Sequence, residues 1–76
     1  MNFMQWIKKY IPPGMELVYL KKAGLTKNMI TIWRRGKSKP TCLPIIYLSM
    51  VISKEQNIDY KTVVVEGIKS AGATNG

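Results

Sequence analysis

Residues 42 to 56 restrict the fold of this chain more than any other segment. Apolar residues recur there with helical spacing on two sides, and Pro44 is compatible with a helix because it falls in the first turn. A helix that is apolar on two sides must lie at the centre of a fold or face a partner. The first and most complete stripe consists of Leu43, Ile46, Tyr47, Met50 and Val51, and the second of Ile45, Leu48 and Ile52.

Three shorter helices are predicted before this one, at about 3–10, 15–23 and 27–35. Asn2 and Thr26 are suitable capping residues for the first and third, and Gly24 and Gly36 are suitable residues to end the second and third. In the first helix, the side chains expected to face the core are Phe3, Trp6, Ile7 and Tyr10. In the second they are Met15, Val18, Tyr19 and Lys22, and Leu17 and Leu20 widen this face. In the third they are Met29, Ile30 and Trp33.

A last element is expected from Tyr60 to about residue 70, capped by Asp59. Its β-branched run at 63–65 is also compatible with a strand, but the apolar residues fit one face of a helix, which is favoured. The sequence therefore predicts an all-α fold, a compact bundle of about five short helices. Residues 1–70 form a single domain, and residues 71–76 are expected to be a flexible tail because they are small and polar.

The chain is strongly basic, and its charge is segregated. Twelve basic and four acidic residues give a net charge of +8 and a pI of about 9.9. Between residues 17 and 54 there are eight Lys and Arg residues and no Asp or Glu. Such a distribution favours a binding face for a polyanion, either a nucleic acid or an anionic membrane surface. A membrane-surface peptide is disfavoured because the apolar stripes are spread over several helices, as a folded core requires.

Several functional classes are not expected from this composition. The chain has no His and one Cys, so a zinc site or an intrachain disulfide is excluded, and no pair of groups for acid–base or nucleophilic catalysis can be assembled. We therefore expect no enzyme activity, no metal, no cofactor and no small-molecule ligand. No apolar run has the length of a membrane span and the N-terminus does not resemble a signal peptide, so a cytoplasmic location is predicted.

The connection at residues 23–26 is typical of a helix-turn-helix. Two short helices are joined there by a turn that contains Gly24, which can adopt the left-handed conformation that other residues tolerate poorly. Leu25 is placed to fill the angle between the helices, and Ile30 and Trp33 can anchor the third helix from its inner side. This arrangement leaves the outer N-terminal surface of that helix free to enter a DNA major groove.

The stretch GLTKNMITIWRRGKSKP, residues 24–40, resembles the helix-turn-helix of the lambda-repressor/Cro family of small phage and bacterial regulators. The resemblance covers roughly residues 15–58. It departs from the family pattern at Glu16, near a usual polar phosphate contact, and at Met29, where a small polar residue is common. The matching positions are Gly24, Leu25, Thr26, Lys27, Asn28, Ile30, Trp33, Gly36, Lys37 and Pro40.

The resemblance implies roles for individual side chains in and around the third helix. An Asn amide can pair with adenine and a Lys can donate to guanine, whereas basic residues that follow the helix position the protein on phosphates. The implied base contacts are Lys27, Asn28, Thr31 and Ile32, the phosphate contacts are Thr26, Arg34, Arg35, Lys37 and Lys39, and the anchors of the recognition helix are Ile30 and Trp33.

These features predict a sequence-specific regulator of transcription that binds double-stranded DNA, most plausibly a repressor of a phage or mobile element, associated with the bacterial nucleoid. One recognition helix reads few base pairs, so a homodimer on paired half-sites is expected. The candidate dimer surface is Ile45, Leu48, Ile52, Val64 and Ile68, although the stripe on 42–56 can equally pack against the first and last helices. The alternatives are an excisionase that bends DNA and a protein-interaction module such as an antitoxin or inhibitor.

Overall fold

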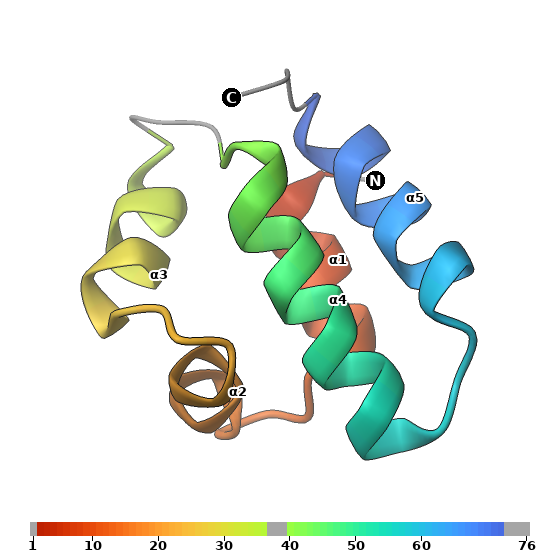
Figure 1. Ribbon diagram of the computed structural model, residues 1–76. Helices are drawn as coiled ribbons and strands as arrows, with labels where there is room; N and C mark the ends of the chain where they lie inside the picture. Colours follow the sequence, from red (N-terminus) through yellow and green to blue (C-terminus); the bar gives the residue numbers. More distant parts are fainter. Residues whose placement is uncertain (1, 37–39, 73–76) are drawn as a thin grey trace.

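The computed structural model describes residues 2–36 and 40–72, and this part of the chain folds into five α-helices without a strand (Figure 1). Residues 63–65 are helical, which confirms the helix that was favoured there over a strand. The helices are α1 (Phe3–Tyr10), α2 (Glu16–Lys22), α3 (Lys27–Arg35), α4 (Cys42–Gln56) and α5 (Tyr60–Ala71). The all-α prediction is confirmed, and the bounds of α1, α3 and α4 are as expected.

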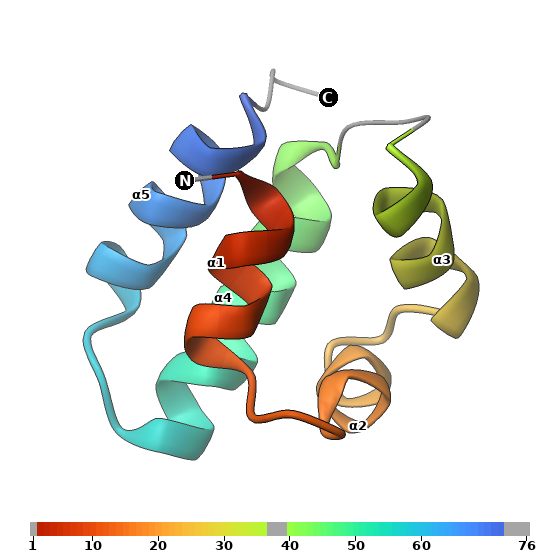
Figure 2. The same ribbon diagram turned by 180° about the vertical axis from the view of Figure 1, so that it is seen from behind.

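The longest helix, α4, runs through the middle of the molecule. Figure 1 shows α1 behind α4, and Figure 2, seen from the opposite side, shows α1 in front of it; in both views α5 lies on one side of this pair and α2 and α3 on the other. The packing of α4 against α5 is the most extensive, and α2 contacts both α4 and α3. In both views α2 is seen almost end-on whereas α3 is seen from the side, so the two helices run in different directions.

The centre of the core is the meeting point of α1, α4 and α5, and it depends on Gly67. A Cβ atom on Gly67 would lie 2.7 Å from Cγ2 of Ile45 and 2.8 Å from Cζ2 of Trp6, so only glycine allows this approach. Both neighbours are completely buried. The indole Nε1 of Trp6 donates a hydrogen bond of 3.1 Å to the carbonyl oxygen of Val63, which satisfies a buried donor. The first and last helices are thus joined through one tryptophan.

The buried face of α4 is the less complete of its two apolar stripes. Ile45, Leu48 and Ile52 are each 0% exposed, and Ser49 is buried between them. The Ser49 hydroxyl donates to the carbonyl oxygen of Ile45 at 2.6 Å, so a polar side chain is tolerated in the core. The assignment of this stripe to a dimer surface is therefore wrong. Its packing against neighbouring helices, the other alternative, is confirmed.

The other two residues of that candidate surface, Val64 and Ile68, are half-buried and pack against the core. The outward face of α4 instead carries residues of the more complete stripe: Leu43, Tyr47 and Met50 are 51%, 44% and 56% exposed. Periodicity could not decide between the stripes because both have helical spacing. The large side chains of α1 and the glycine of α5 select the one that is buried.

The buried face of α2 also differs from the prediction. Tyr19 and Leu20 are buried, whereas Met15, Val18 and Leu17 are 38%, 41% and 54% exposed. A seven-residue helix with apolar side chains on nearly all sides has no unique stripe, so its contacts with α3 and α4 decide the orientation. Tyr19 lies beside α4, where its hydroxyl accepts a hydrogen bond from Gln56 Nε2 at 3.3 Å.

The helix ends confirm some of the expected caps. Asn2 forms a capping box with Gln5, and Asp59 accepts a hydrogen bond from the backbone N–H of Thr62. Thr26 and Thr41 occupy the capping positions, but their side chains make no capping hydrogen bond. Ala71, expected in the tail, is instead the buried last residue of α5. Gly72 ends α5 in the left-handed conformation, and residues 73–76 of the predicted tail lie outside the described residues.

Candidate nucleic-acid interface

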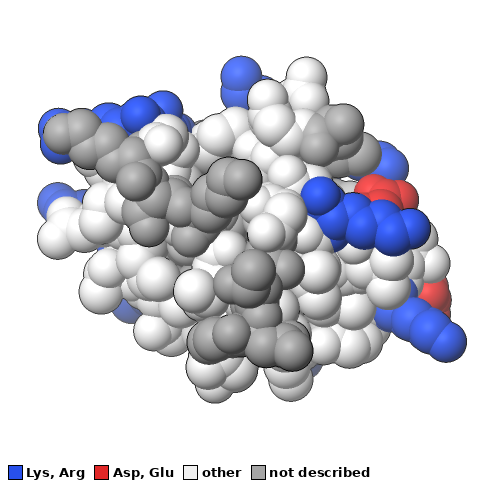
Figure 3. All heavy atoms as spheres, turned by 90° about the horizontal axis from the view of Figure 1, so that it is seen from above, with Lys and Arg blue, Asp and Glu red and all other residues white. Residues whose placement is uncertain are grey.

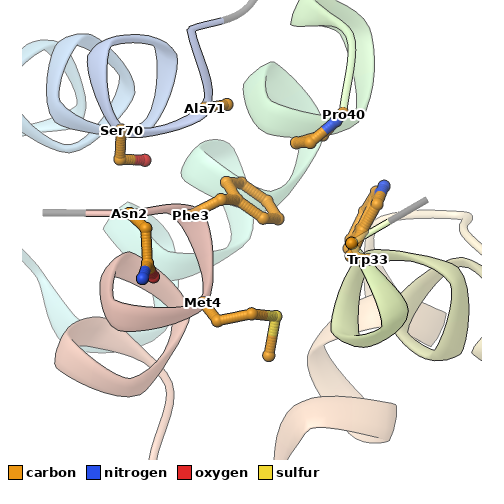
Figure 4. A pocket seen from close by; sticks show the side chains of 8 residues that line it. Asn2, Phe3, Met4, Trp33, Pro40, Ser70 and Ala71 are labelled. Atoms are coloured by element: carbon orange, nitrogen blue, oxygen red, sulfur yellow. The ribbon is translucent and has the colours of Figure 1, made fainter. Parts of the chain in front are cut away.

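One side of α3 is fixed to the body of the protein by aromatic side chains. Ile30 and Trp33 are buried, as predicted for the anchors of this helix. The rings of Trp33 and Phe3 form a T-shaped pair with centroids 5.0 Å apart, and Phe3 stacks on Trp6 at 5.3 Å. Figure 4 shows Phe3 of α1 and Trp33 of α3 side by side at a pocket of about 320 Å³. The described residues that line this pocket carry no charge, so we assign it no chemistry.

The opposite side of α3 is exposed and, apart from Ile32, polar. The helix is strongly amphipathic, because its apolar side is limited to Met29, Ile30 and Trp33. Met29 is half-buried and packs against the core, so it does not belong to the outer face. All six residues of α3 predicted to contact DNA are exposed, namely Lys27, Asn28, Thr31, Ile32, Arg34 and Arg35.

The turn before α3 sets the direction in which that face points. Gly24 has φ +78°, the left-handed conformation expected for it. The N–H of Gly24 donates a hydrogen bond of 3.0 Å to the carbonyl oxygen of Lys21, and the N–H of Leu25 donates one of 2.9 Å to the carbonyl oxygen of Leu20. This pair of bonds is a Schellman motif, which ends α2 and reverses the chain. Leu25 is half-buried against the core, consistent with its expected place in the angle between the two helices.

A hollow of about 450 Å³ separates the outer face of α3 from the start of α2. Both helices therefore contribute side chains to one concave surface, which we call the α2–α3 groove. Its residues are Lys27, Asn28, Ile30, Thr31 and Arg34 from α3, with Gly14, Glu16 and Leu17 from the start of α2 and the turn before it.

The carboxylates of the chain are mostly engaged elsewhere. Glu66 accepts hydrogen bonds from Lys9 at 2.9 Å and from the Tyr10 hydroxyl at 2.8 Å, and these bonds lower the pKa of its carboxyl group. The pKa of Asp59 is lowered by hydrogen bonds from the hydroxyl and N–H of Thr62. Glu55 forms an ion pair with Lys22.

The basic residues of α3 are consequently not neutralised by their neighbours. Within residues 2–36 and 40–72, no ion pair involves Lys27, Arg34 or Arg35. Figure 3 shows the same contrast: basic atoms on the α3 side, at the left, have no acidic atoms beside them in this view, whereas basic and acidic atoms adjoin on the α5 side. The exposed face of α3 therefore presents the cationic groups of Lys27, Arg34 and Arg35 to solvent.

The structure also adds residues that the sequence did not assign to this site. Leu17 was expected to widen the core face of α2, but it lines the groove, as does Gly14. Glu16, which differs from the residue usual in the resembled family, places a carboxylate in the same groove. No spacing signal marks these residues, because they reach α3 only through the crossing of the two helices. The predicted phosphate contacts Lys37 and Lys39 lie outside the described residues.

The described residues offer neither a metal site nor a membrane span. Among the described residues, no cluster of ligating side chains could hold a metal ion, and no helix has the length and hydropathy to cross a membrane. No protein-family model, curated protein or solved structure matches this chain.

Proposed function

We propose that the chain is a sequence-specific DNA-binding regulator of transcription, in which α2, the turn and α3 act as a helix-turn-helix. The observation that carries this proposal is the outer face of α3: it is basic, free of ion pairs among the described residues, and rigidly anchored from behind by Ile30 and Trp33. A nine-residue amphipathic helix with this exposure can enter a major groove without unfolding any packed element.

The two ends of this face have different proposed roles. Lys27 and Asn28 lie in the first turn of α3 and, with Thr31, can reach base edges; Asn28 can form two hydrogen bonds with adenine. Arg34 and Arg35 lie in the last turn, where a guanidinium can pair with the sugar–phosphate backbone. Thr26 makes no capping bond, so the first N–H groups of α3 are available to a phosphate.

The residue content of the groove suits repression better than catalysis or ligand sensing. It contains one carboxylate and no nucleophile–base pair within the described chain. A small regulator of this kind acts by occupying its operator, and we assign it to a phage or mobile element working in the bacterial cytoplasm on the nucleoid. Control would then come from its concentration or from a protein partner.

An electrophoretic mobility shift with genomic fragments tests the proposal. Fragments should be retained with an affinity that falls steeply with salt, at about −0.9 in log K per log salt for each phosphate neutralised. Polyglutamate, added at the same total charge as the competitor DNA, tests the alternative that the basic face binds an acidic protein. The proposal fails if no fragment is retained at moderate salt, or if polyglutamate displaces the DNA as well as unlabelled DNA does.

Asn28→Ala is expected to relax base preference without changing the salt dependence. The side chain is exposed in the first turn of α3, so its removal should leave the fold intact and cost roughly 1–3 kcal/mol on the specific site only. Arg35→Ala is the matched comparison: it should weaken all sequences alike and reduce the salt slope by about one. Identical behaviour of both variants on specific and random DNA would contradict the assigned orientation of α3.

A further inference from the structure

The two walls of the α2–α3 groove differ in their hydrogen-bonding character. The α3 wall carries side chains that donate hydrogen bonds, namely Lys27, Asn28, Thr31 and Arg34. The opposite wall, from the start of α2 and the turn before it, consists of Gly14, Glu16 and Leu17, so it has no cationic side chain among the described residues. A carboxylate accepts hydrogen bonds and donates none. The groove therefore has donors on one wall and a strong acceptor on the other.

Glu16 makes no polar contact of its own within the described chain. It is half-buried, and its carboxylate forms no ion pair or hydrogen bond with another described side chain, although three types of donor line the same groove. The other three carboxylates are each engaged by a neighbour: Glu55 by Lys22, Asp59 by Thr62, and Glu66 by Lys9. Glu16 is thus the carboxylate that is left to meet a ligand of the groove.

A DNA phosphate is a poor partner for the α2 wall. Phosphate and carboxylate are both anionic and both accept hydrogen bonds, and their repulsion at about 4 Å corresponds to roughly a fivefold loss of affinity in water. Glu16 also lies in the first turn of α2, where its charge opposes the attraction of a helix N-terminus for anions. Any DNA register that places a phosphate at this wall is therefore disfavoured.

One kind of group in a major groove can satisfy a carboxylate. The donors there are the exocyclic amines of cytosine and adenine, whereas the other polar groups accept hydrogen bonds. A C·G pair presents its amine at one edge and the two acceptors of guanine at the other, but an A·T pair presents its amine between two acceptors. The walls of the groove match the C·G arrangement, because their acceptor and their donors are also separated.

We infer that Glu16 is a specificity-determining residue, whose carboxylate accepts a hydrogen bond from the exocyclic amine of a base in the groove. With a C·G pair, Lys27 then faces the acceptors of the guanine. Specificity arises from attraction and repulsion together: an amine is bound, whereas a phosphate or a base carbonyl oxygen at the same place is repelled. This inference rests on the proposed function, because it requires DNA in the α2–α3 groove.

Selection of sequences from a pool of random duplexes tests the inference, with the full wild-type chain and Glu16→Gln compared side by side. At one position of the selected site, the wild type should prefer a base with an exocyclic amine by about tenfold, the scale of a hydrogen bond to a charged group. An amide both donates and accepts, so Glu16→Gln should lose this one preference and keep the others. Its affinity for random DNA should rise by up to about fivefold, because a repulsion is removed.

Glu55→Gln is the matched control. It also removes one negative charge, but from an exposed position of α4 outside the groove, so it should strengthen binding to all sequences slightly and preserve every preference. The inference is overturned if Glu16→Gln selects the same sequences as the wild type. It is also overturned if the variant weakens binding to all sequences alike, the result expected of a carboxylate that only orients Lys27 or Arg34.

Methylated bases test the contact without altering Glu16. N4-methylcytosine and N6-methyladenine keep their base pairing, but a methyl group replaces the amine hydrogen in the major groove. When each C and A of the selected duplex is replaced in turn, one such change should lower affinity about tenfold, and its identity shows which base is read. The loss should persist in Asn28→Ala; if every such loss disappears in that variant, the inference is wrong. A wild type that retains no duplex overturns both proposals, whereas a wild type that binds DNA without a preference dependent on Glu16 overturns only this one.

Discussion

Replacing Gly67 with valine is expected to prevent stable folding of this protein. A Cβ at this position would lie 2.7 to 2.9 Å from atoms of Ile45 and Trp6, which are completely buried and cannot move aside. Overpacking of a core by even a small group costs about 1–3 kcal/mol, and valine adds two further methyl groups. A chain of this length is stable by only about 4–11 kcal/mol. Circular dichroism should therefore show a large loss of helix or a sharply lowered urea midpoint.

Two comparisons isolate the steric cause of this effect. Lys69→Val introduces the same β-branched residue at an exposed position of α5 and should cost only a fraction of a kcal/mol, the helix propensity of valine. Gly67→Ala should also destabilise, although alanine normally stabilises a helix relative to glycine. Combined with Ile45→Ala, it should cost less than the sum of the single changes. A Gly67→Ala variant as stable as the wild type would contradict the packing described here.

Neutralising the outer face of α3 should abolish tight DNA binding. In the triple variant Lys27→Gln, Arg34→Gln and Arg35→Gln, affinity at about 0.1 M salt should fall roughly 30- to 1000-fold, and the salt slope should become less steep by about 2.7. The reason is that these three cations form no ion pair with the described carboxylates and are free to release counterions from DNA. Titration of a labelled fragment at several salt concentrations measures both quantities.

The control for this variant has the same net charge. Lys8, Lys61 and Lys69 are exposed on α1 and α5, and they also form no ion pair within the described chain. Their replacement by glutamine removes three charges from exposed positions outside the α2–α3 groove, so DNA affinity should fall only slightly. If the two triple variants lost affinity equally, DNA would be responding to total charge alone, and the assignment of the site to α3 would be wrong.

The local signals in the sequence predicted the helices and the exposed face of α3. Capping residues and breakers such as Asn2, Gly24, Gly36 and Asp59 act through their own backbone neighbours, so helix ends could be placed without knowledge of the fold. The face of α3 could be predicted because its apolar residues, apart from the exposed Ile32, occupy one side only. Exposure of Lys27, Asn28 and Arg34 then follows from burial of Ile30 and Trp33.

Local pattern could not predict which side of α2 and α4 is buried. Both helices are apolar on more than one side, and hydrophobic spacing then has more than one solution. Ile45, Leu48 and Ile52 are buried because Gly67 lets α1 and α5 approach that side of α4 closely, at the cost of enclosing Ser49. The α2–α3 groove, including Glu16 and Leu17, likewise exists only because two helices cross.

The sequence by itself thus determined five helices, their ends and the one amphipathic face that carries the basic residues, because these depend on interactions between residues a few positions apart. The tertiary structure alone decided which stripe of α4 became core and which stayed exposed. That choice depends on the shapes of side chains from three helices, and it put Ile45, Leu48 and Ile52 in the core while Leu43, Tyr47 and Met50 stayed exposed.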